Sequence, residues 1–356
     1  MQAKFPLYWF KVSPHLIKQI HSTASAPIHF YNENNVGNLL LYPCHPWYVD
    51  SISKQPLIQK AIKLGLIIEV GLLGEDHYPT SSFRTVFLPK TNSFMKFSIH
   101  VRLTNCIRKN AWYELDNAVL LTQLICQCSE NALLHCPKFS VMKEPAATTI
   151  DLSSIADGQR NVNVQEVIEC FGILYRNGIS EVDQAKYQPQ MAAALFAWNK
   201  SGISLCAQML QQLASEHGQS YFDFAVQWFD DYLDALLPGV FHYSFNLGIA
   251  FEPHLQNTVI GFENGLPAHV WIRDLEGTKL MESDWSISKL SELSEKARSS
   301  VYYSRKQGWN RIAYYTLINN ISEAIFHISV GQQGLEYKLW LSIAGAIALW
   351  QSNEST

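Results

Sequence analysis

The stretch MKFSIHVRLTNCIRKN, residues 95–110, decides how the first half of the chain folds. Apolar and polar residues alternate along it as far as residue 104, which is the period of a β-strand. One face would carry Met95, Phe97, Ile99, Val101 and Leu103. The other would carry Lys96, Ser98, His100, Arg102 and Thr104. The pattern predicts a strand over 94–105 with one apolar face and one cationic face.

Two interpretations of the cationic face are open. An antiparallel sheet often exposes one face, so the cations can simply form a solvated outer surface. Alternatively they line an anion site, which Arg108 would join if the strand continues past Cys106. Short apolar runs between turn residues predict further strands at 39–42, 67–70 and 85–88, and helical spacing predicts helices at 56–64 and 116–134.

The segment PTSSFRTV, residues 79–86, places hydroxyls and a guanidinium just before the predicted strand at 85–88. These groups bind phosphate oxygens when no glycine-rich loop is present. A polar turn that caps the strand is the alternative. The sequence has no GxxxxGK[ST], GxGxxG, GxSxG or HExxH motif, and no HRD followed by DFG. A nucleotide would therefore be held by side chains.

A third polar cluster lies in the second half of the chain. Glu252-Pro-His-Leu-Gln-Asn257 is followed by a hairpin signal, with apolar runs at 258–262 and 269–274 around the turn Glu263-Asn-Gly265. Asp274 ends the returning strand, so it should lie near Glu252. Two carboxylates of this kind suit Mg²⁺, which prefers oxygen ligands and keeps waters and phosphate oxygens. A core histidine with satisfied hydrogen bonds is the alternative for His254.

Composition limits the class of protein. The chain has 356 residues, a net charge of -4, 47% hydrophobic and 16% charged residues, which argues against disorder and against a duplex nucleic-acid binder. The apolar stretch Leu339–Trp350 is too short to span a membrane and predicts a buried core helix. The N-terminus lacks the pattern of a secretory leader. We expect a cytoplasmic protein whose seven cysteines are reduced and mostly buried.

The chain is expected to be α+β, with a strand-rich domain over 1–160 and a mixed, mainly helical domain over 161–356. The boundary is placed where residues 143–163 become rich in small and polar residues. In the second domain the pattern predicts a strand at 164–175, helices at 188–198, 203–216 and 221–237, with the last stopped by Pro238-Gly239, and further helices from 286 to 351.

Five motifs, taken in order, resemble one enzyme family. They are PCHPW (43–47), PTSSFRTV (79–86), KFSIHVRLTNCIRKN (96–110), EPHLQN (252–257) and RDLEG (273–277). The set resembles the siderophore synthetases that work independently of nonribosomal peptide synthetases, the IucA/IucC family, from about Leu39 to Arg311. The resemblance implies a cupped hand, here with a fingers domain and a palm domain.

The resemblance also implies the chemistry. Such a ligase of siderophore biosynthesis uses ATP and Mg²⁺ to adenylate a polycarboxylate, citrate or a citrate derivative, and condenses it with an amine or alcohol. We expect no covalent enzyme intermediate, because a well-positioned amine can attack the acyl-adenylate directly. The partners would be these small molecules, with no nucleic acid and no membrane. A homodimer would match the family.

Carried over to this sequence, the resemblance assigns roles to individual residues. The ATP phosphates would be held by Ser82, Arg84, Thr85 and Lys96. Nucleotide or carboxylate contacts would come from Thr104, Asn105, Arg108, His254, Gln256, Asn257 and, more weakly, Arg311. Magnesium would be held by Glu252 and Asp274. Lys96, Arg108 and His254 would be catalytic. Lys96, Arg84 and Arg108, together with magnesium, would offset the repulsion between the carboxylate and the phosphates in the transition state.

Three departures from the family pattern are visible in the sequence. His45-Pro-Trp47 stands near the start of this sequence, so we expect the chain to lack the HPxxK-type motif and the thumb that precede it in the family. Pro253 replaces a small residue, and Asn177 follows Arg176 where an Arg-Glu pair is expected. They leave open a truncated, non-catalytic remnant that still binds ATP or a carboxylate. A phosphotransferase that uses Asp274 is a further alternative, which the missing HRD-like base disfavours.

Overall fold

The computed structural model describes residues 3–22, 39–103, 106–156, 162–290 and 293–354. The chain divides into two compact units. The first unit comprises Met1–Leu124, Lys143–Gly178 and Leu293–Ala297, and the second comprises Ile125–Met142, Ile179–Glu292 and Arg298–Thr356. Residues 161–178, which the sequence pattern places after the boundary, thus belong to the first unit, because they supply a strand of its sheet.

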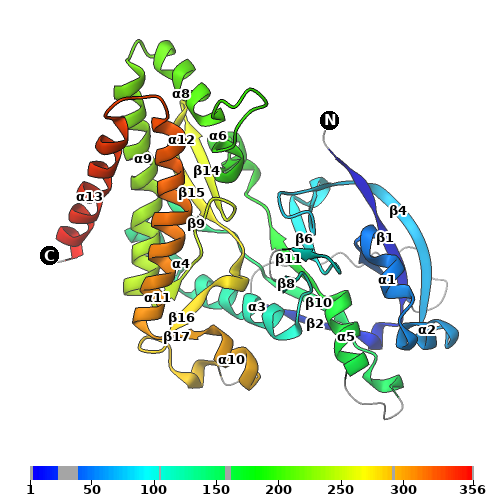
Figure 1. Cartoon of the computed structure of the whole chain (residues 1–356). Coiled ribbons are helices and arrows are strands. Elements are labelled where there is room, and N and C mark those ends of the chain that lie inside the picture. The colour runs from blue at the N-terminus through cyan, green and yellow to red at the C-terminus, as the bar shows by residue number, and fades with distance from the viewer. Residues whose placement is uncertain (1–2, 23–38, 104–105, 157–161, 291–292, 355–356) are drawn as a thin grey trace. The chain divides into compact units, whose positions relative to one another are not determined.

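The first unit is built on an eight-stranded antiparallel sheet (Figure 1), and this confirms the predicted strand-rich part of an α+β fold. Its order is β2 (Ile17–His21), β10 (Ala146–Ile150), β11 (Ile173–Asn177), β6 (Ser93–Phe97), β5 (Thr85–Leu88), β4 (Ile67–Pro79), β1 (Phe5–Val12) and β3 (Leu40–Cys44). The predicted strands at 39–42, 67–70 and 85–88 are confirmed, as is the helix at 56–64, which forms α2 (Pro56–Lys63).

The strand predicted over 94–105 is shorter than expected. It ends at Phe97, and β7 (Arg102–Leu103) pairs separately with β8 (Cys106–Ile107). The alternation holds for the buried Met95, Phe97 and Ile99, but the solvated outer face is wrong at its first two positions. Lys96 and Ser98 are only 3% and 2% exposed. Just beyond the end of β6, the Ser98 hydroxyl accepts the backbone N–H of Asn110 at 2.8 Å.

The segment 164–175 is not the single strand that its apolar residues predict. It forms α5 (Val162–Phe171), then turns at Gly172 and enters β11. Val167, Cys170 and Phe171 are buried at helical spacing, and a short apolar run cannot by itself distinguish a helix from a strand. The predicted helix at 116–134 is present as α3 (Trp112–Gln127) and α4 (Ser129–His135).

The second unit has a smaller four-stranded sheet with helices beside it, and this confirms its mixed, mainly helical character (Figure 1). Its order is β12 (Gln190–Met191), β14 (Thr258–Glu263), β15 (Leu266–Ile272) and β9 (Phe139–Val141). The predicted hairpin is β14 and β15, and Asn264 and Gly265 have the positive φ angles, 53° and 81°, that its tight turn requires. A third sheet joins β13 (Ile249–Ala250), β16 (Lys279–Met281) and β17 (Tyr302–Tyr303).

The long helices of the second unit differ in detail from the prediction. The expected helices at 203–216 and 221–237 are α8 (Leu205–Glu216) and α9 (Tyr221–Phe241), but α9 continues through Pro238. Burial of Leu236, Leu237, Val240 and Phe241 stabilises the turns on both sides of this proline. The expected helix at 188–198 is reduced to α7 (Ala192–Leu195), because Gln190 and Met191 pair with β14 instead.

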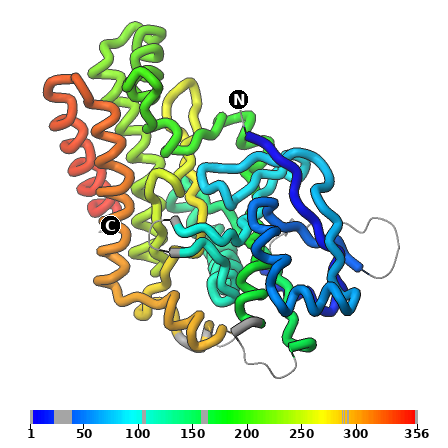
Figure 2. Tube along the Cα trace, turned by 45° about the vertical axis from the view of Figure 1, so that its right-hand side comes forward, coloured from blue at the N-terminus to red at the C-terminus, as the bar shows by residue number. Residues whose placement is uncertain are grey.

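Of the C-terminal helices, the last lies side by side with α9 (Figure 2). They are α10 (Glu295–Val301), α11 (Arg305–Ile312), α12 (Glu323–Ser329) and α13 (Leu335–Glu354), with a π-helical segment at Ala313–Ser322 between α11 and α12. The prediction that Leu339–Trp350 is a buried core helix is wrong for one of its faces. Leu339 and Ile343 are buried, but Leu341 and Leu349 are 47% and 62% exposed.

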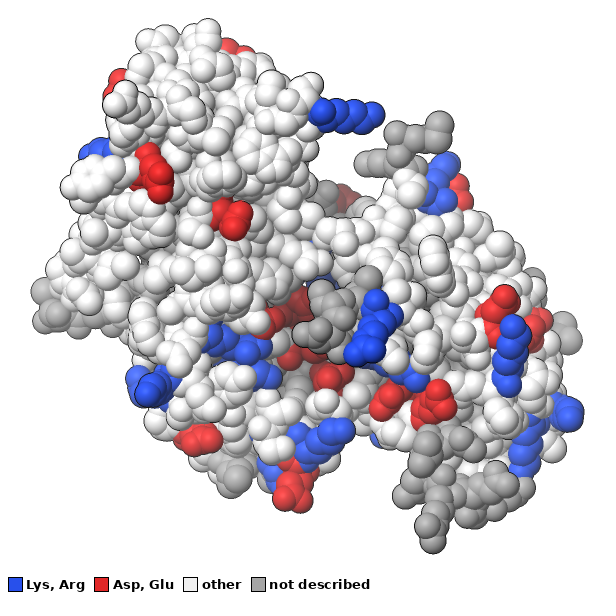
Figure 3. All heavy atoms as spheres, in the orientation of Figure 1, with Lys and Arg blue, Asp and Glu red and all other residues white. Residues whose placement is uncertain are grey.

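No helix within the described ranges is both long enough and apolar enough to cross a membrane. On the face shown in Figure 3, charged side chains are scattered over a mostly uncharged surface, as the composition indicates. Cys44, Cys136, Cys170 and Cys206 are buried thiols, and burial raises the pKa of Cys136 to about 11. The prediction that most cysteines are buried is confirmed for these four.

Candidate active site

Three of the sequence motifs meet in the first unit around His45. Its Nδ1 accepts the backbone N–H of Trp47 at 3.3 Å, so its Nε2 carries the proton and donates to the carbonyl of Phe83 at 3.2 Å. The His45 ring also packs edge-on against Phe97. HPW, PTSSFRTV and KFSIH are therefore neighbours in space, and His45 has a structural role that joins them.

We expect His45 to make the folded state sensitive to acid. Burial lowers its pKa from 6.5 to about 4, so the unfolded chain takes up its proton first as the pH falls. The stabilisation is fully present above pH 6.5 and is lost as the pH falls towards 4, up to about 3 kcal/mol. Urea unfolding at several pH values should show a shallower loss for His45→Gln. An unchanged slope would contradict this assignment.

The predicted phosphate residues lie on and beside two paired strands of the first unit. Thr85 on β5 is directly opposite Lys96 on β6, and both side chains are 3% exposed. Opposite residues of an antiparallel pair share a face, so Thr85 and Lys96 lie together. Arg84 precedes Thr85 and is also buried, at 6% exposed. Ser82 is half-buried, and its carbonyl accepts the Thr85 N–H at 2.6 Å.

Arg108 is held beside these residues by its backbone. Its carbonyl accepts the N–H of Ile99 at 2.9 Å and lies 3.4 Å from Nη1 of Arg84, while its own N–H donates to Val101. Thr104 and Asn105 lie outside the described residues. The structure thus brings Arg84, Thr85, Lys96 and Arg108 into one region of the first unit.

Asn110 is the polar residue of this region that the sequence reasoning missed. It is 2% exposed, and its side-chain oxygen accepts from Nη1 of Arg84 at 2.7 Å. A buried asparagine needs partners for both ends of its amide. Its position at the end of the quoted motif is a weak signal, because nothing local predicts which partners it takes.

In the second unit, Glu252 and Arg311 form an ion pair that the sequence did not predict. Nη2 of Arg311 lies 2.5 Å from Oε1 of Glu252, and the two side chains are 15% and 16% exposed. The Arg311 guanidinium also lies over the rings of Tyr303 and Tyr315. Tyr315, in the π-helical segment, hydrogen bonds to Glu252, and burial together with that carboxylate raises its pKa to about 12. π-Helical turns are frequent at functional sites.

The loop RDLEG closes around Glu252. Gly277 leaves so little room that a Cβ atom there would overlap the Glu252 carboxylate, which explains the glycine. Asp274, before it, has a φ of 74°, an uncommon conformation for a residue other than glycine. Strain of this kind concentrates at functional sites. Both observations support a functional role for the loop.

His254 lies close to the same acidic groups. Its ring centroid is 5.5 Å from that of Tyr315, and burial lowers its pKa while Glu252 and Asp274 oppose the shift. The three residues that the sequence placed together are therefore together. Asn257 is buried and donates to the carbonyl of Glu252 at 3.2 Å, whereas Gln256 is exposed. Asn257 thus helps to shape the loop.

The number of carboxylates near His254 suits a magnesium ion. Glu252 and Asp274 supply two carboxylates, and magnesium commonly takes one or two from the protein and the rest of its ligands from water and phosphate. Within the described residues no group of three or more His, Cys, Asp or Glu is placed to hold a metal.

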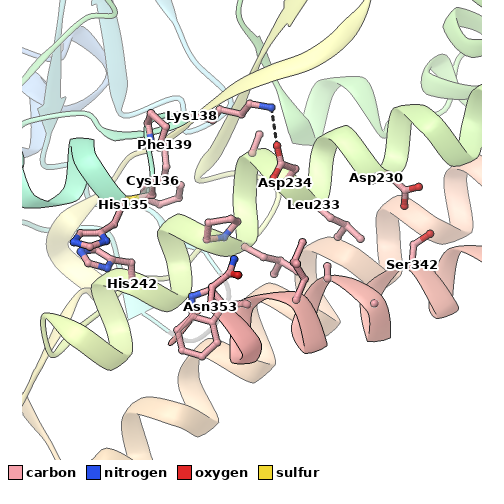
Figure 4. Close-up of a pocket in the computed structure, with 18 of the residues that line it drawn as sticks. His135, Cys136, Lys138, Phe139, Asp230, Leu233, Asp234, His242, Ser342 and Asn353 are labelled. Carbon is pink, nitrogen blue, oxygen red and sulfur yellow. Dashed lines mark hydrogen bonds and ion pairs between the residues drawn. The ribbon is translucent and has the colours of Figure 1, made fainter. Parts of the chain in front are cut away.

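A separate pocket of about 810 Å³ lies between α9, α13 and the α4–β9 connection (Figure 4). His135 and His242 stack at one end, with ring centroids 4.7 Å apart, and Lys138 pairs with Asp234 at 2.6 Å. Leu233, Leu237 and Trp350 are among its apolar lining. None of the predicted site residues lines it, so it is distinct from both clusters.

Comparison with known proteins identifies the family. The sequence profile of the IucA/IucC family matches residues 1–197, more than half of the chain. The chain belongs to the IucA/IucC family. Residues 226–354 of this family member also match the profile described as ferric iron reductase FhuF-like transporter.

Curated relatives are named as citrate ligases. An L-2,3-diaminopropanoate–citrate ligase of Staphylococcus aureus is 27% identical over 316 residues, which cover 88% of this chain and 52% of the relative. A spermidine-citrate ligase of Bacillus anthracis is 24% identical over 81% of this chain and 46% of its own. This IucA/IucC chain therefore spans about half the length of these relatives.

A solved structure supports the fold. The ATP-bound aerobactin synthetase IucA of Klebsiella pneumoniae superposes with a TM-score of 0.84 at 23% identity, over 98% of this chain and 63% of that one. The predicted resemblance to the siderophore synthetase architecture is thereby confirmed. At this identity the likeness concerns the fold.

Proposed function

We propose that this chain acts in siderophore biosynthesis as an ATP- and magnesium-dependent ligase. It would adenylate citrate or a citrate derivative and condense it with an amine or alcohol. The observation that carries the proposal is the burial of Arg84 and Lys96 beside one another in the first unit. A guanidinium and an ammonium group placed together can bind phosphate oxygens by charge-assisted hydrogen bonds, and ATP supplies such oxygens. Family membership and the named relatives support citrate as the acid.

The proposed chemistry follows from charge. A carboxylate of the acid attacks the α-phosphorus of ATP, pyrophosphate leaves, and the amine then displaces AMP from the acyl-adenylate. Arg84, Lys96 and Arg108 would bind phosphate oxygens and stabilise the charge that develops on them. Glu252 and Asp274 would hold magnesium, which when bound neutralises phosphate charge. Arg311 would contact a carboxylate of the acid from its place beside Glu252.

Acid-dependent release of pyrophosphate tests the proposal. With ATP and magnesium, citrate or another polycarboxylate should release pyrophosphate, and addition of a polyamine or amino-acid amine should release AMP. Arg108→Ala and His254→Ala should each lower the rate by about 100-fold or more, because each removes a side chain that is proposed to contact the nucleotide or the acid. Circular dichroism should show both variants folded.

The outcomes separate this function from its alternatives. ADP in place of AMP would indicate a phosphotransferase and overturn the ligase. ATP binding without release of pyrophosphate for any acid would leave a binding protein. Near-normal turnover in both variants would show that the site residues are wrong.

A further inference from the structure

Asn110 is the centre of a buried hydrogen-bond network in the first unit. Its Oδ1 accepts from Nη1 of Arg84 at 2.7 Å, and its Nδ2 donates to the carbonyls of Lys96 and Gly172, both at 2.9 Å. Its backbone N–H donates to Ser98. Both ends of the amide have partners of the matching kind, so the network fixes which way the amide points.

This network ties together segments that are distant in sequence. Lys96 lies on β6, and Gly172 immediately precedes β11, the strand that pairs with β6. A Cβ atom on Gly172 would lie 2.8 Å from the carbonyl oxygen of Asn110, so only glycine lets the two backbones approach this closely. The position of Arg84 is therefore set by the same amide that joins the ends of two neighbouring strands.

The chemistry of the amide matters as much as its position. Nη1 of Arg84 donates to the Asn110 amide oxygen at 2.7 Å and lies 3.4 Å from the Arg108 carbonyl oxygen. An amide oxygen carries no charge, so Asn110 can orient the guanidinium without itself forming an ion pair with it.

We propose that Asn110 is the positioning residue that orients Arg84 for the phosphates of ATP without neutralising it. This inference rests on the proposed function, since it takes the phosphates of ATP to be the anion at Arg84. Asparagine supplies an uncharged acceptor for Arg84 and a donor for two carbonyl oxygens. An aspartate would form an ion pair with the guanidinium and would place its carboxylate against the two carbonyl oxygens. An alanine would remove the acceptor that lies 2.7 Å from Nη1 of Arg84.

The experiment compares ATP with adenosine, which lacks phosphates, by isothermal titration and competition on the full chain. Asn110→Ala should lower the ratio of ATP to adenosine affinity by about 10- to 100-fold, the effect of a displaced charge-assisted contact. Asn110→Asp should lower this affinity ratio at least as much. Because aspartate has the size and shape of asparagine, this variant tests the positioning role if the alanine variant does not fold. Asn117→Ala is the control, because buried Asn117 donates to Ala297 in the same unit, and should leave the ratio unchanged.

General loosening of the unit would lower both affinities and leave their ratio unchanged. If folded Asn110 variants keep the ratio while Arg84→Ala lowers it, the positioning role is overturned and the phosphate site stands. If Arg84→Ala also keeps the ratio, the phosphate assignment fails, and the role of Asn110 fails with it.

Discussion

Replacement of Glu252 by Gln should lower the magnesium-dependent release of pyrophosphate by at least about 100-fold, the scale of losing a preorganised charge at a reacting centre. The amide has the size of the carboxylate, so it should still fit against Gly277, where space is tight. It carries no charge, so it cannot hold a hard cation well. It also leaves Arg311 without its partner at 2.5 Å, which should cost about 2 kcal/mol of stability.

Arg311→Ala separates the two roles of this ion pair. It breaks the same pair and keeps the Glu252 carboxylate, so it should raise the KM for the acid and leave the magnesium dependence near that of the wild type. Glu263→Gln is the control, since Glu263 forms only an exposed pair with Lys186, at 3.2 Å. If the Glu252 and Arg311 variants showed the same magnesium and acid dependence, the ion pair would be purely structural.

Local patterns predicted the parts of the fold that local forces decide. The short apolar run Thr85–Leu88 and the Asn264-Gly265 turn are signals of neighbouring residues alone, and the strand and the turn that they predict are both present. The helix that continues through Pro238 depends on what α9 packs against, which no window of sequence contains. The same is true of α5, whose apolar run is compatible with either type of element until burial decides it.

In the candidate site, too, the features set by neighbouring residues are predictable and those set by folding contacts are not. Arg84, Lys96, Glu252 and His254 are predicted from the sequence because their motifs concentrate charged and hydrogen-bonding groups in a few residues. Their partners were not found, because Asn110 and Tyr315 acquire their roles only through contacts made by folding. Tyr315 lies more than sixty positions from the carboxylate that it contacts. Such residues have ordinary local surroundings, so periodicity and motif spacing carry no signal for them.

Arg176→Ala should lower the free energy of unfolding of the first unit by about 3–5 kcal/mol, the cost of leaving a buried charge unpaired. Glu144, its partner, is 0% exposed, and Arg176 is 3% exposed. Urea unfolding followed by tryptophan fluorescence measures the loss. Glu166→Gln is the control, because its pair with Lys109, at 3.3 Å, is partly exposed and should be worth less than about 1 kcal/mol.

The position of Glu144 explains how Arg176 is paired although the residue after it is Asn177. Asn177 stands where an Arg-Glu pair is expected, which leaves Arg176 without an adjacent acid, yet Glu144 supplies the carboxylate from before β10. If the cost of Arg176→Ala is that of an unpaired charge, then Glu144→Gln combined with Arg176→Met should be less destabilising than Arg176→Ala alone, since neither residue then carries a charge. Equal losses in the two variants would mean that packing of the Arg176 side chain, and not its charge, stabilises this part of the sheet.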